Sequence, residues 1–214
     1  RSQKQLEELR PYVEGICASV ETTAMPLHDE VCPDKPLEPY EHLLQSLKGF
    51  KRSCCIIIGI GEQKKDLDSL LDFIDRNKLD RITFYALKPV KGSPYKESPD
   101  PDYYAWWIEE TRKRFPKLEI MAGLTPKKVD YAEKVIRAGA NGLTKFPAIR
   151  KFNSKEAADV ERGVKNAGKK LDSSLTKLPK LDWMAEIDKL DLDNNIKQEM
   201  KKTVPMYLKK MEKK

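Results

Sequence analysis

The strongest hydrophobic pattern in the chain is the apolar run over residues 54–60, and the neighbouring patterns are arranged around it. Such an uninterrupted run is typical of a strand that is buried on both faces in a parallel sheet. It ends in Gly59-Ile60-Gly61-Glu62, and leucines and isoleucines at helical spacing follow over residues 64–77. Glycines at this position either let a flat or phosphorylated ligand approach the backbone closely or allow a tight turn into the helix.

Strand-like and helix-like patterns alternate on both sides of this run. The alternation predicts right-handed βαβ units and a parallel sheet whose active face lies at the carboxyl ends of the strands. Five strands are too few to close an eight-stranded barrel. Residues 22–36 are predicted as a long polar loop, with His28 at the surface. The predicted strands cover residues 12–21, 54–60, 81–87, 118–123 and 141–146, and the predicted helices cover residues 37–47, 64–77, 102–115, 125–138 and 154–167.

The last part of the chain has a different character. Residues 169–214 are rich in charge, have leucines at helical spacing and contain no glycine, and a final helix is predicted over residues 193–212. We therefore expect an α/β part at residues 1–168 and a helical appendage at residues 169–214.

Composition and charge narrow the class of protein. Of the 214 residues, 35% are charged and 39% hydrophobic, and no stretch approaches the ~18 consecutive apolar residues of a membrane helix. The net charge of +7 gathers late in the chain, which fits a solvated helix face or contact with acidic partners better than nucleic acid. The four cysteines, at positions 17, 32, 54 and 55, form neither a CxxC pair nor a metal-site spacing, so a reducing cytoplasm is expected.

Five short motifs, in a fixed order between residues 15 and 150, carry a resemblance to a known family. Residues 55–62 resemble the signature GxIxGxxE, with Cys55 in place of the first glycine. The other motifs are VET at 20–22, KPVKGSP at 88–94, MAG at 121–123 and AGAN at 138–141. Together they resemble the biotin synthase-like branch of the radical S-adenosylmethionine enzymes, over about two-thirds of the chain. The resemblance implies the C-terminal portion of a (β/α) barrel of the TIM-barrel type, with strands four to eight of eight.

The same resemblance implies cofactors and an activity. The cofactors are S-adenosylmethionine and a [4Fe–4S] cluster; because the CxxxCxxC loop that holds the cluster is absent, we expect the cluster on residues outside this chain. The first expectation is a subunit of an archaeal-type lipoyl synthase, which inserts sulfur into an octanoyl group on a carrier protein and works with a second radical subunit. Ser53 and Glu119 replace the auxiliary-cluster cysteine and arginine of biotin synthase, which argues against biotin synthase itself. Other relatives in this branch, including cofactor maturases and mutases, stay open.

The resemblance also places the cofactor on named residues. The hydroxyl of Ser19 and the carboxylate of Glu21 are expected beside the ribose hydroxyls, although Glu21 would equally suit a salt-bridged strand end. The backbone at Ile57 and Gly59 is expected to form the floor under the adenine, and the backbone at Lys88 is expected to cover it.

Three residues are candidates for catalysis. Because strand side chains alternate, Cys17 is predicted to share a face with Ser19 and Glu21, and Cys55 to share it with Ile57 and Gly59. The two thiols should then face one another, either as small buried hydrophobes or as an auxiliary iron–sulfur or sulfur-donor site. Cys54 is predicted to point into the helix layer. Tyr85 is predicted to face the substrate cavity or to pack in the core.

Two other classes of function fit the same patterns. The chain can be a non-radical aldolase-type barrel enzyme in which Lys88 or Lys145, each near the carboxyl end of a strand, forms a Schiff base. It can also be a non-catalytic subunit that supports a partner.

Overall fold

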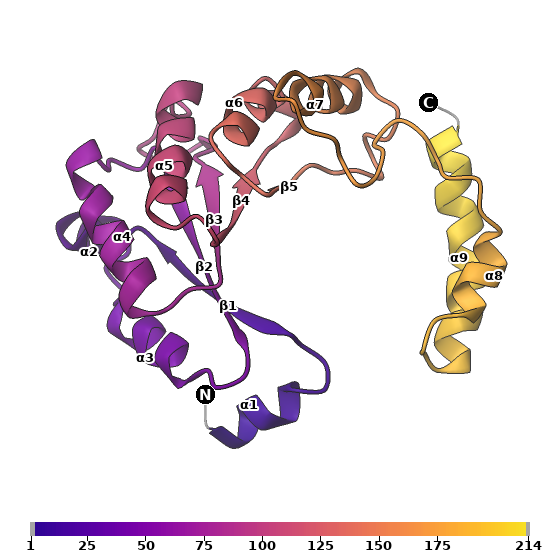
Figure 1. Cartoon of the computed structure of the whole chain (residues 1–214), viewed down its shortest axis with the longest axis horizontal. Coiled ribbons are helices and arrows are strands. Elements are labelled where there is room, and N and C mark those ends of the chain that lie inside the picture. The colour runs from indigo at the N-terminus through magenta and orange to yellow at the C-terminus, as the bar shows by residue number, and fades with distance from the viewer. Residues whose placement is uncertain (1–2, 213–214) are drawn as a thin grey trace. The chain divides into compact units, whose positions relative to one another are not determined.

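The apolar runs predicted as strands form one parallel sheet in the computed structural model, which describes residues 3–212 (Figure 1). Within these residues the sheet has five strands, and each is hydrogen-bonded to the next in chain order. The predicted α/β class and parallel sheet are therefore confirmed, whereas a closed barrel is not shown. The strands are β1 (Gly15–Glu21), β2 (Lys51–Ile58), β3 (Arg81–Ala86), β4 (Glu119–Gly123) and β5 (Gly142–Thr144).

The chain divides into two units. The first contains the chain up to Leu124 and the segment Lys134–Lys145, and the second contains Thr125–Glu133 and the chain from Phe146 onward. The predicted division at residue 168 stays a prediction. The helices are α1 (Gln3–Leu9), α2 (Met25–Val31), α3 (Glu38–Ser46), α4 (Leu67–Arg76), α5 (Pro101–Arg114), α6 (Tyr131–Arg137), α7 (Lys155–Asn166), α8 (Trp183–Asp188) and α9 (Asn194–Glu212), with short 3₁₀ helices at Lys64–Asp66 and Pro126–Lys128.

One face of the sheet is apolar and lies under the helices of the first unit. Right-handed connections between strands in simple chain order place every crossover on the same face. Figure 1 shows α3, α4 and α5 together on one side of the strands. Alternate side chains of the strands point into this layer and are almost completely buried, namely Ala18, Val20, Cys54, Ile56, Ile58, Ile82, Phe84, Ile120 and Ala122.

Two predicted details are corrected. The predicted polar loop at residues 22–36 contains the helix α2, which begins at Met25 without a side-chain cap. His28 in this helix is 1% exposed rather than at the surface. Thr125 makes no capping hydrogen bond with its side chain, because a short 3₁₀ helix precedes α6. The predicted cap of α7 is confirmed, since Ser154 accepts a hydrogen bond from the backbone of Ala157.

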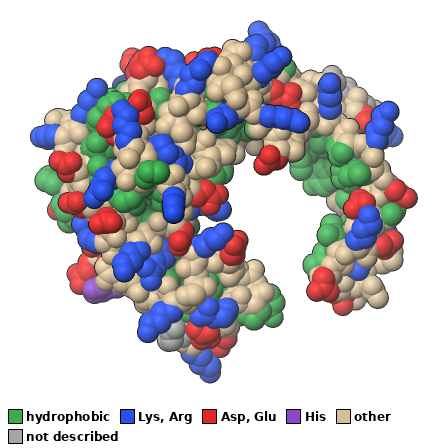
Figure 2. Space-filling model, viewed as in Figure 1, with side chains coloured by type: hydrophobic (Ala, Val, Ile, Leu, Met, Phe, Trp, Pro, Cys, Tyr) green, Lys and Arg blue, Asp and Glu red, His purple; other side chains and the backbone are tan. Residues whose placement is uncertain are grey.

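The second unit is held together by a carboxylate of α7. Glu161 accepts hydrogen bonds from the hydroxyls of Ser174 and Thr176 and from the backbone of Leu175, which ties the segment after α7 back to that helix. The helices α8 and α9 follow, so the predicted helical C-terminal segment is present. No helix between residues 3 and 212 is long and apolar enough to span a bilayer. Basic and acidic side chains alternate over the face in Figure 2, without a broad patch of one sign.

The buried hydroxyl of Tyr104 joins α5 to two strands. It donates a hydrogen bond to the carbonyl of Phe84 in β3 at 2.6 Å and accepts one from the backbone of Gly123 in β4 at 3.1 Å. Tyr104 and Phe84 are both 0% exposed. The hydroxyl therefore satisfies backbone groups that water does not reach.

We expect Tyr104→Phe to lower the free energy of unfolding by about 1–3 kcal/mol, because it leaves these buried backbone groups without a partner. Urea unfolding followed by circular dichroism measures the change. Tyr103→Phe is the matched control on the same helix: its hydroxyl donates to a half-buried carbonyl, that of Glu62, and we expect a loss of about 0.5–1 kcal/mol. Equal losses in the two variants would contradict this account.

Candidate functional site

The face of the sheet opposite the helices carries the candidate chemistry. We call it the open face. Apart from Cys55 and Thr83, its side chains in the strands β1 to β4 are exposed or half-buried within the described chain. They form three rows across the sheet because the strands pair in register. The rows are Cys17, Ser53, Arg81 and Glu119; Ser19, Cys55, Thr83 and Met121; and Ile57, Tyr85 and Gly123.

The structure brings the two candidate cysteines together on this face. Cys17 lies opposite Ser53, and Cys55 lies one step further along, opposite Ser19, so the two thiols meet diagonally. The Cys55 thiol donates a hydrogen bond to the hydroxyl of Ser19 at 3.0 Å. The prediction that both cysteines lie on one face of the sheet is therefore confirmed. Their offset along the strands follows from the register between β1 and β2, which side-chain alternation alone did not predict. Cys54 points into the helix layer as predicted and is 0% exposed.

The pKa values of the two thiols are shifted in opposite directions. Hydrogen bonding by Cys55 and by the hydroxyl of Ser53, with the nearby charge of Arg81, lowers the pKa of Cys17 to about 7 against the effect of burial. The same pairing with Cys17, together with burial, raises the pKa of Cys55. Thiolate is the nucleophilic form of cysteine, so Cys17 is the reactive member of the pair.

The third row presents the aromatic ring of Tyr85, and a lysine that follows β5 lies beside this ring. The ring of Tyr85 lies over Gly123, where an added Cβ would come within 2.3 Å of it. The ammonium of Lys145 lies 4.7 Å from the centre of the same ring, which is a cation–π contact. Burial raises the pKa of Tyr85. Tyr85 thus faces away from the helix layer. Of its two predicted positions, this agrees with the one outside the core.

The amino-terminal end of the open face is closed by an ion pair. Arg81 and Glu119 make two hydrogen bonds, of 2.7 and 3.0 Å, between guanidinium and carboxylate. By the family resemblance, Glu119 occupies the position of the arginine that binds an auxiliary cluster in biotin synthase. In this structure its carboxylate pairs with Arg81 of the neighbouring strand β3. The ion pair therefore completes the row that contains Cys17 and lies one row before Cys55.

The glycine motif after β2 forms a turn that Glu62 holds. The carboxylate of Glu62 accepts hydrogen bonds from the backbone of Gly59 at 2.7 Å and of Ile60 at 3.0 Å. Gly59 has φ +103°, and the side chain of Pro99 would lie 2.9 Å from a Cβ added there. The loop before α5 therefore occupies the space that the missing side chain of Gly59 leaves. The turn itself is held by the partly buried carboxylate of Glu62, whose pKa is raised by burial.

Glu21 lies at the end of β1 in a strained conformation. The register shifts between Ser19 and Glu21, so Glu21 lies beside Ile56 and not in the row of Ile57. Its φ is +60°, and its carboxylate pairs with the ammonium of Lys35 at 2.6 Å. Strict alternation therefore fails at this strand end, because the bulge re-aims the side chain. The salt-bridged strand end that the sequence left open is the observed arrangement.

The other predicted site residues are Ile57 and Lys88. Ile57 is half-buried on the open face, next to Tyr85 in register. Lys88 follows the end of β3 and has an exposed side chain. The assignment of Ser19, Glu21, Ile57, Gly59 and Lys88 to a cofactor, and of Cys17, Cys55 and Tyr85 to catalysis, stays a prediction.

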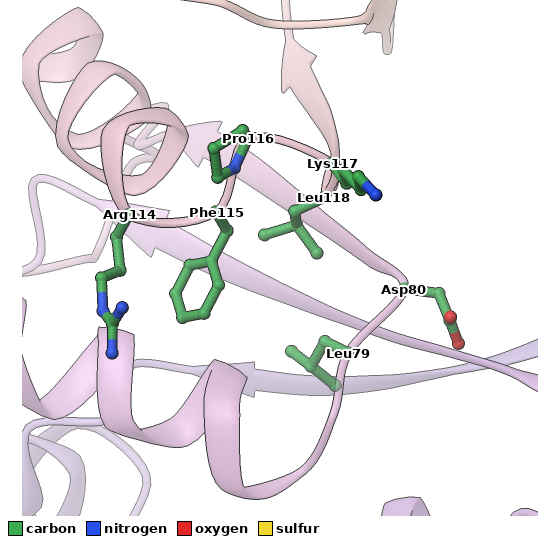
Figure 3. A pocket seen from close by; sticks show the side chains of 7 residues that line it. All are labelled: Leu79, Asp80, Arg114, Phe115, Pro116, Lys117 and Leu118. Atoms are coloured by element: carbon green, nitrogen blue, oxygen red, sulfur yellow. The ribbon is translucent and has the colours of Figure 1, made fainter.

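Two cavities of the first unit can be compared with the candidate site. The cavity beside Glu21, Glu62 and Trp107 has a volume of about 10 Å³, which is room for one water molecule at most. A hollow of about 480 Å³ lies at the amino-terminal ends of β3 and β4, where Leu79, Phe115 and Leu118 line it (Figure 3). Ligands of parallel α/β sheets bind at the opposite, carboxyl ends, so this hollow is separate from the candidate site.

The residues present fit S-adenosylmethionine in part and do not fit the cluster. Carboxylate and hydroxyl oxygens at the end of β1, those of Glu21 and Ser19, suit ribose hydroxyls. For iron, the part of the chain that the structure describes contains no group of three or more His, Cys, Asp or Glu side chains that could hold a metal ion. The expected location of the cluster outside this chain stays a prediction.

Sequence reasoning missed three residues of this region. Lys35 and the supporting role of Glu62 involve contacts that the spacing along the chain does not reveal. His28 is buried in α2, and among residues 3–212 neither of its ring nitrogens has a hydrogen-bond partner. The only sequence signal for it was its position in a loop that follows a strand.

Comparison with known proteins relates the chain to sulfur-transferring enzymes over part of its length. It is similar to ribosomal protein uS12 methylthiotransferase RimO. The Thermus thermophilus protein is 36% identical over 70 residues, which are 29% of this chain and 16% of RimO. The Aeromonas hydrophila protein is 35% identical over 72 residues, which are 34% of this chain and 13% of RimO. This similarity supports in part a relationship to radical S-adenosylmethionine enzymes.

A longer match covers most of the chain. An uncharacterized protein of Methanocaldococcus jannaschii is 36% identical over 168 residues, which are 77% of this chain and 47% of the relative. The chain thus spans about half the length of that relative. No family model matches the chain. The RcsB response regulator of Salmonella typhimurium covers 92% of this chain and 91% of its own at 12% identity, but the TM-score of 0.32 is too low to indicate a shared fold.

We expect Cys17 to react with iodoacetamide at a rate that reaches half its maximum near pH 7, because the Cys55 hydrogen bond stabilises its thiolate. Cys55→Ala removes this donor and should move the midpoint toward pH ~8.5, the usual value for cysteine. Cys32 is the internal control: burial raises its pKa, so its midpoint should lie higher and should not move in the variant. Residue-resolved mass spectrometry over a pH series gives both midpoints, and an unchanged Cys17 midpoint in Cys55→Ala would refute the assignment.

Proposed function

We propose that this chain forms part of a radical S-adenosylmethionine enzyme that attaches sulfur to carbon. The observation that carries the proposal is the partial identity to RimO, whose name describes a methylthiotransferase of a ribosomal protein. The order of the strands and the polar groups at their carboxyl ends support it, since cofactors of parallel α/β enzymes bind at that edge.

The finer proposal is sulfur insertion of the lipoyl synthase type, on an octanoyl group carried by a protein and with a second radical subunit. It is supported by the sequence motifs of the biotin synthase-like branch and by the thiol pair on the open face. Methylthiotransfer, as in RimO, is the alternative that the comparisons favour. Both reactions form a carbon–sulfur bond, so the general proposal does not depend on the choice between them.

In the proposed site, Glu21 and Ser19 bind the ribose and the backbone from Ile57 to Gly59 lies under the adenine. Bound S-adenosylmethionine supplies the group that activates a C–H bond. The chain's own contribution is to orient this cofactor through Glu21, whose position the bulge in β1 and the ammonium of Lys35 determine. The polar open face then receives the carbon that accepts sulfur.

We expect Glu21→Ala to weaken the binding of S-adenosylmethionine to the full-length enzyme by about 1.5–3 kcal/mol, the scale of a hydrogen bond to a charged group. Isothermal titration calorimetry measures the loss. Glu14→Ala is the matched control, because Glu14 pairs with Lys51 at the opposite end of the same strands and is largely exposed. Wild-type affinity in Glu21→Ala, or an equal loss in Glu14→Ala, would remove Glu21 from the site.

We expect the chain of residues 1–214 to bind no stoichiometric [4Fe–4S] cluster when it is treated with iron and sulfide, because the three clustered cysteines that hold such a cluster in this family are missing from its sequence. Iron analysis and the visible absorption spectrum give the stoichiometry. Four iron atoms per chain, with reductive cleavage of S-adenosylmethionine, would show that the cluster ligands lie within this chain.

A further inference from the structure

We propose that Cys17 is a persulfide carrier, whose thiolate accepts a sulfane sulfur atom from a donor persulfide and holds it on the open face between Ser53 and Cys55. The carrier would supply sulfur for carbon–sulfur bond formation, and this use rests on the proposed function. The loading of Cys17 itself does not, because it requires only the side chains around the thiol.

The geometry makes one thiol accessible and the other sheltered. Cys17 is exposed on the open face of β1, whereas Cys55 on β2 is 9% exposed. The Cys55 thiol is within hydrogen-bonding reach of Cys17 and lies 3.0 Å from the hydroxyl of Ser19, so its single proton is donated either to the Cys17 thiolate or to Ser19. Within the described chain, Cys17 is therefore the more accessible of the two thiols, and Cys55 lies beside it.

The polar groups around Cys17 suit an anionic sulfur. The hydroxyl of Ser53, the thiol of Cys55 and the positive charge of Arg81 all favour the thiolate, and they act against burial and the neighbouring Cys54. A persulfide carries its negative charge on the outer sulfur, one bond further from the strand. The same donors therefore lie near the outer sulfur and stabilise its negative charge in the loaded form.

The register keeps the two cysteines from forming a disulfide. Cys55 lies two residues beyond the partner of Cys17 on the neighbouring strand. With a strand spacing of ~4.8 Å and a rise of ~3.3 Å per residue, their Cα atoms are roughly 8 Å apart. A disulfide needs less than ~7 Å without backbone movement. Cys55 thus cannot displace the sulfane sulfur by closing a disulfide, so a persulfide on Cys17 persists.

The loading step balances without any oxidant. The Cys17 thiolate attacks the outer sulfur of a donor R–S–SH, a new sulfur–sulfur bond forms on Cys17, and the donor's own sulfur–sulfur bond breaks to release R–S⁻. The proton stays with the transferred sulfur or passes to R–S⁻. The transferred sulfur keeps its oxidation state throughout.

A metal site is the competing use of two facing thiols. Among residues 3–212, no third His, Cys, Asp or Glu side chain joins them in a metal-binding group. Zinc sites and iron–sulfur clusters need more ligands than two thiolates. Sulfur transfer needs only one nucleophile and nearby hydrogen-bond donors, which this face provides.

The test treats the full-length protein with glutathione persulfide at pH 7 and maps added sulfur by peptide mass spectrometry. We expect one added sulfur on Cys17, formed roughly five times faster than on Cys32: its thiolate fraction is more than tenfold larger, and the lower nucleophilicity of a more acidic thiolate offsets part of this gain. Dithiothreitol should release the added sulfur as sulfide. Cys17→Ser should lose the modification, and the matched control Cys32→Ser should keep it.

Cys55→Ala distinguishes the carrier arrangement from a merely exposed thiol. We expect Cys17 to load several times more slowly in this variant, because the thiol donor is gone. Equal labelling of Cys17 and Cys32 in the wild type, no added sulfur on Cys17, or a Cys17–Cys55 disulfide as the product would overturn the proposal. Glu21→Ala should load Cys17 normally, so a failure of the cofactor assignment is seen separately from a failure of the carrier.

Discussion

The constraint on which the structure depends is the one-directional order of its parallel strands. Each strand pairs with the next in the chain, so right-handed connections place the helices of the first unit on one face of the sheet. That face takes the apolar half of every strand, including Val20, Ile58 and Phe84. The other face then carries the polar and sulfur-containing half, and this separation is what exposes Cys17, Ser19 and Tyr85.

Two residues at strand ends have strained backbones. Glu21, the last residue of β1, and Lys145, after β5, have φ of 60° and 68°, a region that non-glycine residues rarely adopt, whereas Gly59 adopts its φ of 103° without strain. The strain at Glu21 and Lys145 costs free energy that surrounding contacts must offset. The offsetting contacts are specific: Lys35 pairs with Glu21, and Tyr85 lies against Lys145. Strain maintained in this way at the carboxyl edge agrees with a binding edge there.

The proposed cofactor residues and the two thiols lie at different positions along the strands. Groups suited to a nucleoside lie at the carboxyl edge, around Glu21 and Gly59. The thiols lie further from that edge: Cys17 is in the same row as the Arg81–Glu119 ion pair, and Cys55 is one row closer to the carboxyl edge. An enzyme that forms carbon–sulfur bonds needs a cofactor site and a sulfur source within reach of one substrate. In the proposed function, the residues at the carboxyl edge would meet the first need and the thiols on the open face the second.

Much of the fold followed from local pattern. The apolar run of β2, the alternation of strands with helices and the capping Ser154 each act through neighbours in the chain, so their periodicity and residue types were sufficient. The helix α2 was missed because it begins at Met25 without a capping side chain and because its His28 is buried by tertiary packing, at 1% exposure. Helix propensity depends on the local sequence and does not reflect such tertiary contacts.

For the site, the sequence by itself determined which strands carry Cys17, Cys55 and Tyr85 and which face they share, because side-chain direction alternates along a strand. The tertiary structure alone decided the rest. The stagger of the two thiols depends on the register between β1 and β2, and the direction of Glu21 depends on a bulge and on Lys35, fourteen residues away. Register, bulges and ion pairs arise between segments that are distant in the chain, and no periodicity within one segment encodes them.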